Sequence, residues 1–130
     1  MKKNDYREPL KEIPLKKQVT NVRARIWRIL KDAGAWDSTL SYQVELAASD
    51  IVVWRKLRDD VLSLDSLITT IERDNGSMAP KAHPLLNEYR EQAKIVQKDC
   101  DLLLMNIKSK KGKEVAADGL KEFMARMAEA

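Results

Sequence analysis

The sequence predicts an all-α fold, and three observations carry that prediction. Glycine and proline each occur only four times in 130 residues and phenylalanine once, while helix-favouring Lys, Glu, Ala and Leu are abundant. Apolar residues recur every three or four positions over long segments, as on one face of a helix. The chain is long enough for one domain with a core. We expect a basic arm and short helix over residues 1–35, a long antiparallel helical hairpin over 36–107, and a flexible linker with a short C-terminal helix or tail over 108–130.

Charge is distributed unevenly along the chain. Residues 1–31 carry ten Lys/Arg and three Asp/Glu, residues 32–107 carry eight and thirteen, and residues 108–130 carry six and four. A net charge of +7 at the start thus precedes a segment of −5, which indicates a polyanion-binding end on an acidic body. The alternative is a solvated lysine-rich tail. We favour the binding end because the basic bias continues into a predicted helix.

The basic segment is predicted to begin as an arm and continue as a helix. Residues 1–19 contain two prolines and no sustained period, which indicates an extended arm. Thr20 and Asn21 are good N-cap residues, and apolar residues then recur at helical spacing as far as Gly34. Basic side chains flank this stripe and would neutralise DNA phosphates. The candidate DNA-binding residues are Lys2, Lys3, Lys16, Lys17, Arg23, Arg25, Arg28 and Lys31.

One apolar stripe predicts a first long helix from about residue 39 to residue 74. Ser49-Asp50 could bend or break it, because both residue types prefer caps to helix interiors. Asn75 and Gly76 end it, since both tolerate a left-handed backbone. The stripe consists of Leu40, Val44, Ala47, Ile51, Trp54, Leu57, Val61, Leu64, Ile68 and Ile71.

A heptad seam predicts a second long helix over residues 84–107. Pro84 suits its first turn. Near its end, residues 102–105 are apolar all round the helix, and a single neighbouring helix cannot cover them. We therefore expect further copies of the chain to do so. The seam consists of Leu86, Tyr89, Ala93, Val96, Cys100, Leu103 and Ile107. The predicted oligomerisation residues are Trp54, Leu57, Val61, Leu64, Tyr89, Val96, Leu102, Leu103 and Leu104.

The C-terminal segment is predicted to be a flexible lysine-rich break followed by a short helix from about Gly119. One face of that helix would dock a partner, with a simply packed terminus as the alternative. The predicted docking residues are Leu120, Phe123, Met124 and Met127.

Catalytic chemistry has little support in the sequence. The single histidine, His83, lies between two loop prolines, and Cys100 lies on the heptad seam, where it serves as a small apolar residue. No nucleotide-binding glycine motif is present. Asp99 and Asp101 are read as a solvated face or as pairing partners between subunits, and a two-metal carboxylate site is disfavoured. We expect no enzyme activity, no metal and no cofactor.

The sequence also predicts a cytoplasmic protein with no membrane partner. The charged N-terminus lacks the apolar stretch of a secretory signal. No apolar run approaches the roughly 20 residues of a membrane span. One cysteine cannot form an internal disulfide, which agrees with a reducing compartment.

The loop between the two predicted helices has the pattern G-x-x-x-x-K-x-H-P-L-L. This pattern spans Gly76, Lys81 and the run His83-Pro84-Leu85-Leu86. It resembles the small subunit of tailed-phage terminases, in the subgroup with a Gly…Lys-x-(His/Asn)-Pro loop between two central helices. The resemblance covers roughly residues 36–107. The chain departs from the group at its end, where a lysine tail replaces the Leu-Gly-Leu-(Ser/Thr)-Pro stretch.

The resemblance implies a viral DNA-packaging factor that forms a homo-oligomeric ring in the cytoplasm of the infected bacterial host. Such a subunit binds double-stranded DNA and recruits the terminase large subunit, which carries the ATPase and nuclease. The alternatives are a dimeric helical DNA-binding regulator and a non-catalytic helical assembly adaptor.

Overall fold

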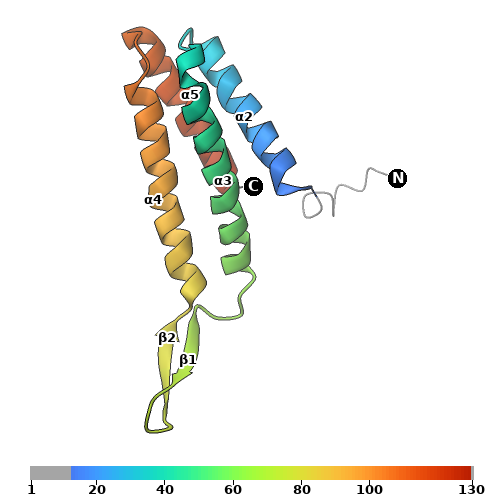
Figure 1. The fold of residues 1–130 in the computed structure, drawn as a ribbon, viewed down its shortest axis with the longest axis vertical. Helices are drawn as coiled ribbons and strands as arrows, with labels where there is room; N and C mark the ends of the chain where they lie inside the picture. Colours follow the sequence, from blue (N-terminus) through green and yellow to red (C-terminus); the bar gives the residue numbers. More distant parts are fainter. Residues whose placement is uncertain (1–12, 130) are drawn as a thin grey trace, which may run out of the picture.

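The computed structural model describes residues 13–129, which form four α-helices, a 3-10 turn and a two-stranded antiparallel sheet (Figure 1). The predicted predominance of helix is confirmed, and the sheet was not predicted. The elements are α2 (Leu15–Asp32), η1 (Ser38–Leu40), α3 (Ser41–Leu62), β1 (Ile68–Glu72), β2 (Met78–Ala82), α4 (Pro84–Met105) and α5 (Lys110–Glu129).

The helices run alternately up and down the molecule (Figure 1). In that view α2, α3 and α4 lie side by side, and α5 crosses behind α3. α5 packs against both α2 and α4, so the helices surround one core. The β1–β2 hairpin projects beyond the bundle at the end where α3 stops and α4 starts (Figure 1).

Each helix contributes an apolar stripe to the core. Burial of one large aliphatic side chain stabilises the fold by about 1.5–3 kcal/mol relative to leaving it exposed. The largest fully buried side chains are those of Ile26, Leu30, Leu40, Val44, Ile51 and Leu103. Ala116, Leu120 and Phe123 complete the core from α5.

The first helix starts earlier than the sequence predicted. α2 begins at Leu15, so the last five residues of the predicted arm are helical. Pro14 precedes it, and the Pro14 carbonyl accepts the N–H groups of Lys17 and Gln18 at 3.0 and 3.1 Å. Proline suits a helix start because its missing N–H would have no partner there. Val19 then packs against the core and extends the apolar stripe.

The predicted helix over 39–74 is wrong beyond Leu62, where α3 ends. Ile68 and Ile71, expected on its stripe, lie instead in β1. Residues 68–71 are four consecutive β-branched residues, which favour a strand over a helix. The three-residue spacing of Ile68 and Ile71 resembled the helical period.

A tight turn joins the two strands of the hairpin. Gly76 has a φ of +84°, a backbone conformation that favours glycine. The Asn75 side chain accepts the N–H of Ser77 at 3.0 Å. Asn-Gly between two strand-forming runs is a strong hairpin signal, and the sequence analysis had taken it for a helix end.

The predicted second helix corresponds to α4, which begins at Pro84. His83 precedes it, and its Nδ1 accepts the N–H of Leu85 at 3.2 Å. Most of the heptad seam faces the core as predicted: Val96, Leu103 and Ile107 are buried, and Tyr89, Ala93 and Cys100 pack against them.

Contacts along their length hold α3 and α4 together. The Trp54 and Tyr89 rings are stacked, with centroids 6.2 Å apart. Closer to the middle, the Gln92 amide donates to the backbone carbonyl of Asp50 at 2.9 Å.

The predicted flexible linker and short terminal helix are replaced by one continuous helix, α5. Gly112 and Gly119 do not break it, because they lie where α5 approaches α2. A Cβ at Gly119 would lie 2.7 Å from Cγ2 of Ile29, and Ala116 beside it is fully buried. Absence of a side chain at Gly119 therefore permits the close contact.

Arg58 ties α3 to the end of α5. Its Nη1 donates to the carbonyl oxygens of Met127 and Ala128 at 2.6 and 3.0 Å. The guanidinium carbon also lies 5.8 Å from the Trp54 ring centroid. Only 8% of Arg58 is exposed. A buried cation thus satisfies carbonyls that the end of a helix leaves open.

The residues predicted to dock a partner lie in or against the core. Leu120 and Phe123 are buried, with Phe123 3% exposed, and Met124 and Met127 are partly buried against the same cluster. Packing within the chain therefore accounts for this apolar face.

Phe123→Ala is expected to lower the free energy of unfolding by about 3–5 kcal/mol, because it removes a large core side chain and leaves a cavity. Urea unfolding followed by circular dichroism measures the change. Val115→Ala on the same helix, where the side chain is 48% exposed, is the matched control and should have a small effect. If Phe123→Ala were as stable as the parent, the Phe123 side chain would lie at the surface and not in the core.

Candidate nucleic-acid interface

α2 presents six exposed cationic side chains. Its apolar residues Val22, Ile26 and Leu30 are buried, so the remaining faces of the helix carry the charge. Asp32 is the single acidic residue of α2. The exposed predicted DNA-binding residues are Lys16, Lys17, Arg23, Arg25, Arg28 and Lys31. The other two predicted residues, Lys2 and Lys3, lie outside the described residues.

Three of the six cations contact neighbouring side chains. Arg23 forms a 2.8 Å ion pair with Glu45 of α3, in which both side chains stay about half exposed. Arg25 lies over the ring of Phe123, 5.7 Å from its centroid, and Lys31 lies 4.6 Å from the Trp27 centroid. An exposed pair of this kind contributes roughly 0–1 kcal/mol, so these contacts orient the cations and leave them open to an anion.

Lys17 and Arg28 form an outward ridge. They are eleven residues apart, about three helical turns, and therefore lie on one face of α2. Among residues 13–129 neither has an ion-pair partner. Lys31, three residues after Arg28, continues this face. Within these residues, the ridge can therefore contact phosphates without first breaking an ion pair.

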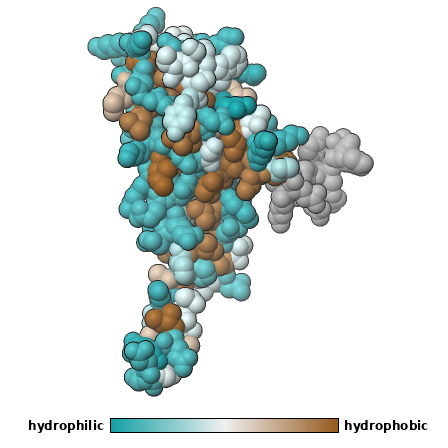
Figure 2. All heavy atoms as spheres, in the orientation of Figure 1, coloured by the Kyte–Doolittle hydropathy of each residue, from teal (hydrophilic) through white to brown (hydrophobic). Residues whose placement is uncertain are grey.

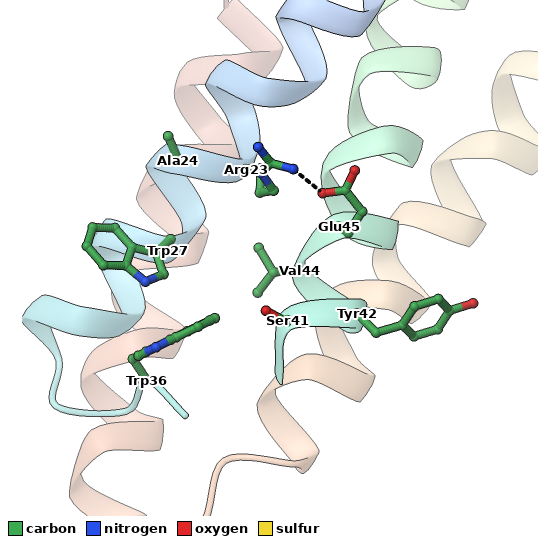
Figure 3. Close-up of a pocket in the computed structure, with 8 residues that line it drawn as sticks. All are labelled: Arg23, Ala24, Trp27, Trp36, Ser41, Tyr42, Val44 and Glu45. Atoms are coloured by element: carbon green, nitrogen blue, oxygen red, sulfur yellow. Dashed lines mark hydrogen bonds and ion pairs between the residues drawn. The ribbon is translucent and has the colours of Figure 1, made fainter. Parts of the chain in front are cut away.

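An open aromatic groove runs beside this ridge, between α2 and the start of α3 (Figure 3). Its volume is about 650 Å³. Trp27 and Trp36 meet edge to face, with ring centroids 6.3 Å apart. Tyr42 points away from them, and the Arg23–Glu45 pair closes the other side (Figure 3). Flat aromatic walls beside a cation suit the stacking of an exposed base.

Trp27 contacts Trp36, which packs against the core, and keeps about a third of its surface exposed. The sequence analysis did not predict the groove. Its lining comes from two elements, and the local sequence does not show that these elements lie close together. Its residues are Arg23, Ala24, Trp27, Trp36, Ser41, Tyr42, Val44 and Glu45.

A second group of lysines, Lys108, Lys110 and Lys111, lies at the C-terminal end of α2. All three are exposed, and neighbouring Gly112 is placed so that a Cβ there would lie 3.3 Å from the Ala33 carbonyl oxygen. The pKa of Asp37 is lowered by hydrogen bonds from Thr39, and also by the charge of Lys108. Lys108 lies in the connection before α5, and Lys110 and Lys111 lie in its first turn, so these lysines extend the basic surface of α2.

Asp99, predicted on a solvated face, is buried between α4 and α3 and only 9% exposed. Burial, then a hydrogen bond with Asp50 and the charge of Asp50, raises the pKa of Asp99 to about 7, against the opposing charge of Lys98. The physical reason is that a carboxylate loses its hydration on burial, so the neutral acid is favoured. Below pH 7 the protonated form of Asp99 is favoured, and its carboxyl can donate a hydrogen bond to the carboxylate of Asp50.

Side chains with catalytic potential are engaged in packing or capping. The His83 ring caps α4. Burial, with the nearby carboxylates of Asp99 and Asp101, raises the pKa of the Cys100 thiol to about 11. A thiol with such a pKa is a poor nucleophile at neutral pH. Among residues 13–129, no group of three His, Cys, Asp or Glu side chains is placed to hold a metal ion.

Only part of the predicted oligomerisation set is available at the surface. Trp54, Val61, Val96 and Leu103 are buried in the chain's own core, so in this fold they cannot contact another copy. Leu57, Leu64, Tyr89 and Leu104 are half-buried, and Leu102 is exposed. The helical period had identified the apolar stripe without showing which neighbour covers it.

A different apolar face remains exposed on α3 and α4 (Figure 2). In that view apolar residues gather along the middle of the molecule, on the side turned away from α5. Leu46 and Val53 lie seven residues apart on α3, as do Ile95 and Leu102 on α4, so each pair shares a helix face. Exposed apolar residues of these helices include Leu46, Val53, Ile95, Leu102 and Met105.

Comparison of the chain with protein-family models, curated proteins and solved structures finds no match. Within the described part of the chain, none of the helices combines the length and apolar content needed to cross a membrane.

Stability should fall as the pH rises from about 4 to 7 because of Asp99. In that range the unfolded carboxyl, with a pKa of about 3.9, has lost its proton, whereas the folded carboxyl, with a pKa of about 7, retains it. The folded state therefore binds more protons than the unfolded state in this range. The stabilisation that Asp99 provides at low pH is lost as the pH passes 7.

Asp99→Asn keeps a hydrogen-bond donor toward Asp50 and removes the carboxyl group that titrates. Urea unfolding between pH 5 and 8 should then show a smaller decline in stability than the parent. Asp101→Asn, at an exposed position on the same helix, is the matched control. Parallel pH profiles for parent and Asp99→Asn would show that Asp99 is ionised in the fold.

Proposed function

We propose that this chain is a non-catalytic DNA-binding subunit of a viral packaging machine, in the role of a terminase small subunit. The observation that carries the DNA-binding part is the outward cationic face of α2, extended at its end by Lys108, Lys110 and Lys111. Packing of Val22, Ile26 and Leu30 holds that face toward solvent.

Double-stranded DNA is the polyanion that this surface suits best. Each phosphate neutralised by Lys or Arg releases a condensed counterion, which supplies affinity independent of sequence. Arg28, near the C-terminal end of α2, can reach base edges in a groove while the lysines hold the backbone. Trp27 and Trp36 offer a second mode of contact, in which a base that has left the stack lies in the aromatic groove.

Self-association into a ring is the second part of the proposal. The exposed apolar residues of α3 and α4 form a face that water contacts unfavourably. A heterologous contact from this face to a different face of the next copy closes into a ring when the rotation permits. A ring would array several α2 surfaces on one DNA molecule, so that weak contacts add through effective concentration.

Recruitment of the terminase large subunit, in the cytoplasm of an infected bacterial cell, is the third part. It is supported by the loop resemblance at residues 76–86. Gly76 and Pro84 of that pattern form a turn and a helix start, whereas Lys81 is exposed and is the residue of the loop that a partner could contact. A dimeric DNA-binding regulator and an assembly adaptor are the alternatives, and subunit number together with DNA affinity separates them.

The triple variant Lys17→Ala, Arg28→Ala, Lys31→Ala should lose about two to three units of the slope of log K against log salt concentration, because each phosphate contact contributes about 0.9. Fluorescence anisotropy of a labelled duplex between about 50 and 200 mM salt gives the slope. The control removes the same charge from α3 and α4, through Lys56→Ala, Lys94→Ala and Lys98→Ala. Equal losses of slope in the two variants would show that α2 has no specific role in DNA binding.

Replacing Val53 and Ile95 together by lysine should dissociate the oligomer, since two charges then enter the apolar face. Light scattering at micromolar concentration measures the mass. Val115→Lys on α5 is the control, because it adds a charge at an exposed position outside this face. A parent chain that is monomeric under these conditions would exclude the ring.

A further inference from the structure

The turn between α2 and α3 holds Trp36 against Trp27 in a fixed arrangement. Gly34 has a φ of +68°, a backbone conformation that favours glycine, at the point where the chain leaves α2. The Asp37 side chain then accepts the Thr39 N–H at 2.9 Å and caps the start of η1. Trp36, between these two points, packs against the core. The aromatic groove is therefore formed before any ligand enters it.

Trp27 lies where the cationic ridge of α2 meets this groove. Lys31 follows Trp27 by one helical turn, and its ammonium nitrogen lies 4.6 Å from the Trp27 ring centroid. Arg28 is the next residue along the chain and points about 100° away around the helix axis. Phosphates held by Arg28 and Lys31 would thus bring an adjoining base to the Trp27 ring. Cations beside an aromatic ring are the usual arrangement in sites for single-stranded nucleic acid.

The polar side of the groove is an ion pair. Arg23 from α2 and Glu45 from α3 point toward one another, with a distance of 2.8 Å between Nη1 and Oε2 (Figure 3). Their charges offset each other, so the groove itself does not favour a free anion. Both side chains stay about half exposed, and together they offer hydrogen-bond donors and an acceptor. The edge of a nucleobase also carries donors and acceptors, so a base matches this groove.

An unpaired base suits the groove better than a base within a duplex. The groove volume of about 650 Å³ lies within the range of about 300–1,000 Å³ that is typical of small-molecule sites. A base in a duplex must be unstacked and unpaired before it can enter, whereas a single-stranded base has already lost these contacts. Its faces can then stack on an aromatic ring, and its pairing edge is open to polar side chains.

We infer that the groove binds an unpaired base, so that the chain prefers a junction between duplex and single-stranded DNA to a blunt duplex. Lys17 and Arg28 of the ridge hold the duplex phosphates, and the groove of Trp27 and Trp36 receives a base of the single strand. Base binding at this place rests on the proposed contact of α2 with DNA, and it adds a preference for one form of DNA. Contact with phosphates alone would not depend on the base.

Three labelled DNAs with the same duplex part test this preference. One is blunt, one has a short single-stranded extension, and one has the same extension with abasic sites, which keep the phosphates and lack the bases. Fluorescence anisotropy should show about tenfold tighter binding of the base-bearing extension than of the abasic one, because stacking on an aromatic ring favours a base. Equal affinities for these two DNAs, or no binding of the base-bearing one, overturn the inference.

The blunt duplex separates this result from the proposed function. Its affinity and salt slope report on the phosphate contacts of the ridge. If the blunt duplex binds and the two extended DNAs have equal affinities, the base site is overturned and the duplex-binding role stands. If the base-bearing extension binds more tightly than the abasic one while the blunt duplex does not bind, the base site is supported and the duplex-binding role is overturned.

Trp27→Leu should abolish the difference between the base-bearing and abasic extensions, because leucine keeps an apolar side chain and lacks an aromatic face. Leu15→Ala, at a 49% exposed position of the same helix outside the groove, is the matched control and should keep the ratio of affinities seen in the parent. Circular dichroism checks that both variants remain helical, and the comparison of DNAs in the parent chain needs neither variant. Base binding by the groove is overturned if Trp27→Leu keeps the parent's ratio or if Leu15→Ala loses it equally.

Discussion

Burial of the α2 stripe is the constraint on which the surfaces of this protein depend. Leu30 is fully buried and Val22 and Ile26 nearly so, which sets the rotation of α2 about its own axis. With that rotation set, Lys17 and Arg28 face solvent, and Arg23 faces Glu45 on α3. A turn of the helix by one residue, about 100°, would bury cations at a cost that the core cannot offset.

α5 makes that burial possible. Phe123 covers the stripe, Gly119 allows the backbones of α5 and α2 to approach, and Arg58 joins the end of α5 to α3. The C-terminal segment is thus a wall of the core that also places its first lysines beside α2. α5 therefore contributes both to the basic surface and to the stability of the bundle.

The proposed activities use separate parts of the molecule. Cations lie on α2 and the exposed apolar face lies on α3 and α4, whereas the β1–β2 hairpin projects beyond the bundle (Figure 1). This separation allows DNA binding and self-association to occur together. The buried Asp50–Asp99 contact lies between α3 and α4, so the helices that carry the apolar face are also joined by a proton-dependent contact.

The sequence by itself determined the predominance of helix, the span of α4 and the cationic character of α2, because periodicity, caps and charge are local properties. It could not distinguish a helical stripe from β-branched Ile68 and Ile71 in a strand, since a spacing of three suits both. Which copy or element covers an apolar residue was decided only by tertiary packing. Phe123 became core because α2 lies beside it, and the pKa of Asp99 is raised because burial removes its hydration and Asp50 lies next to it.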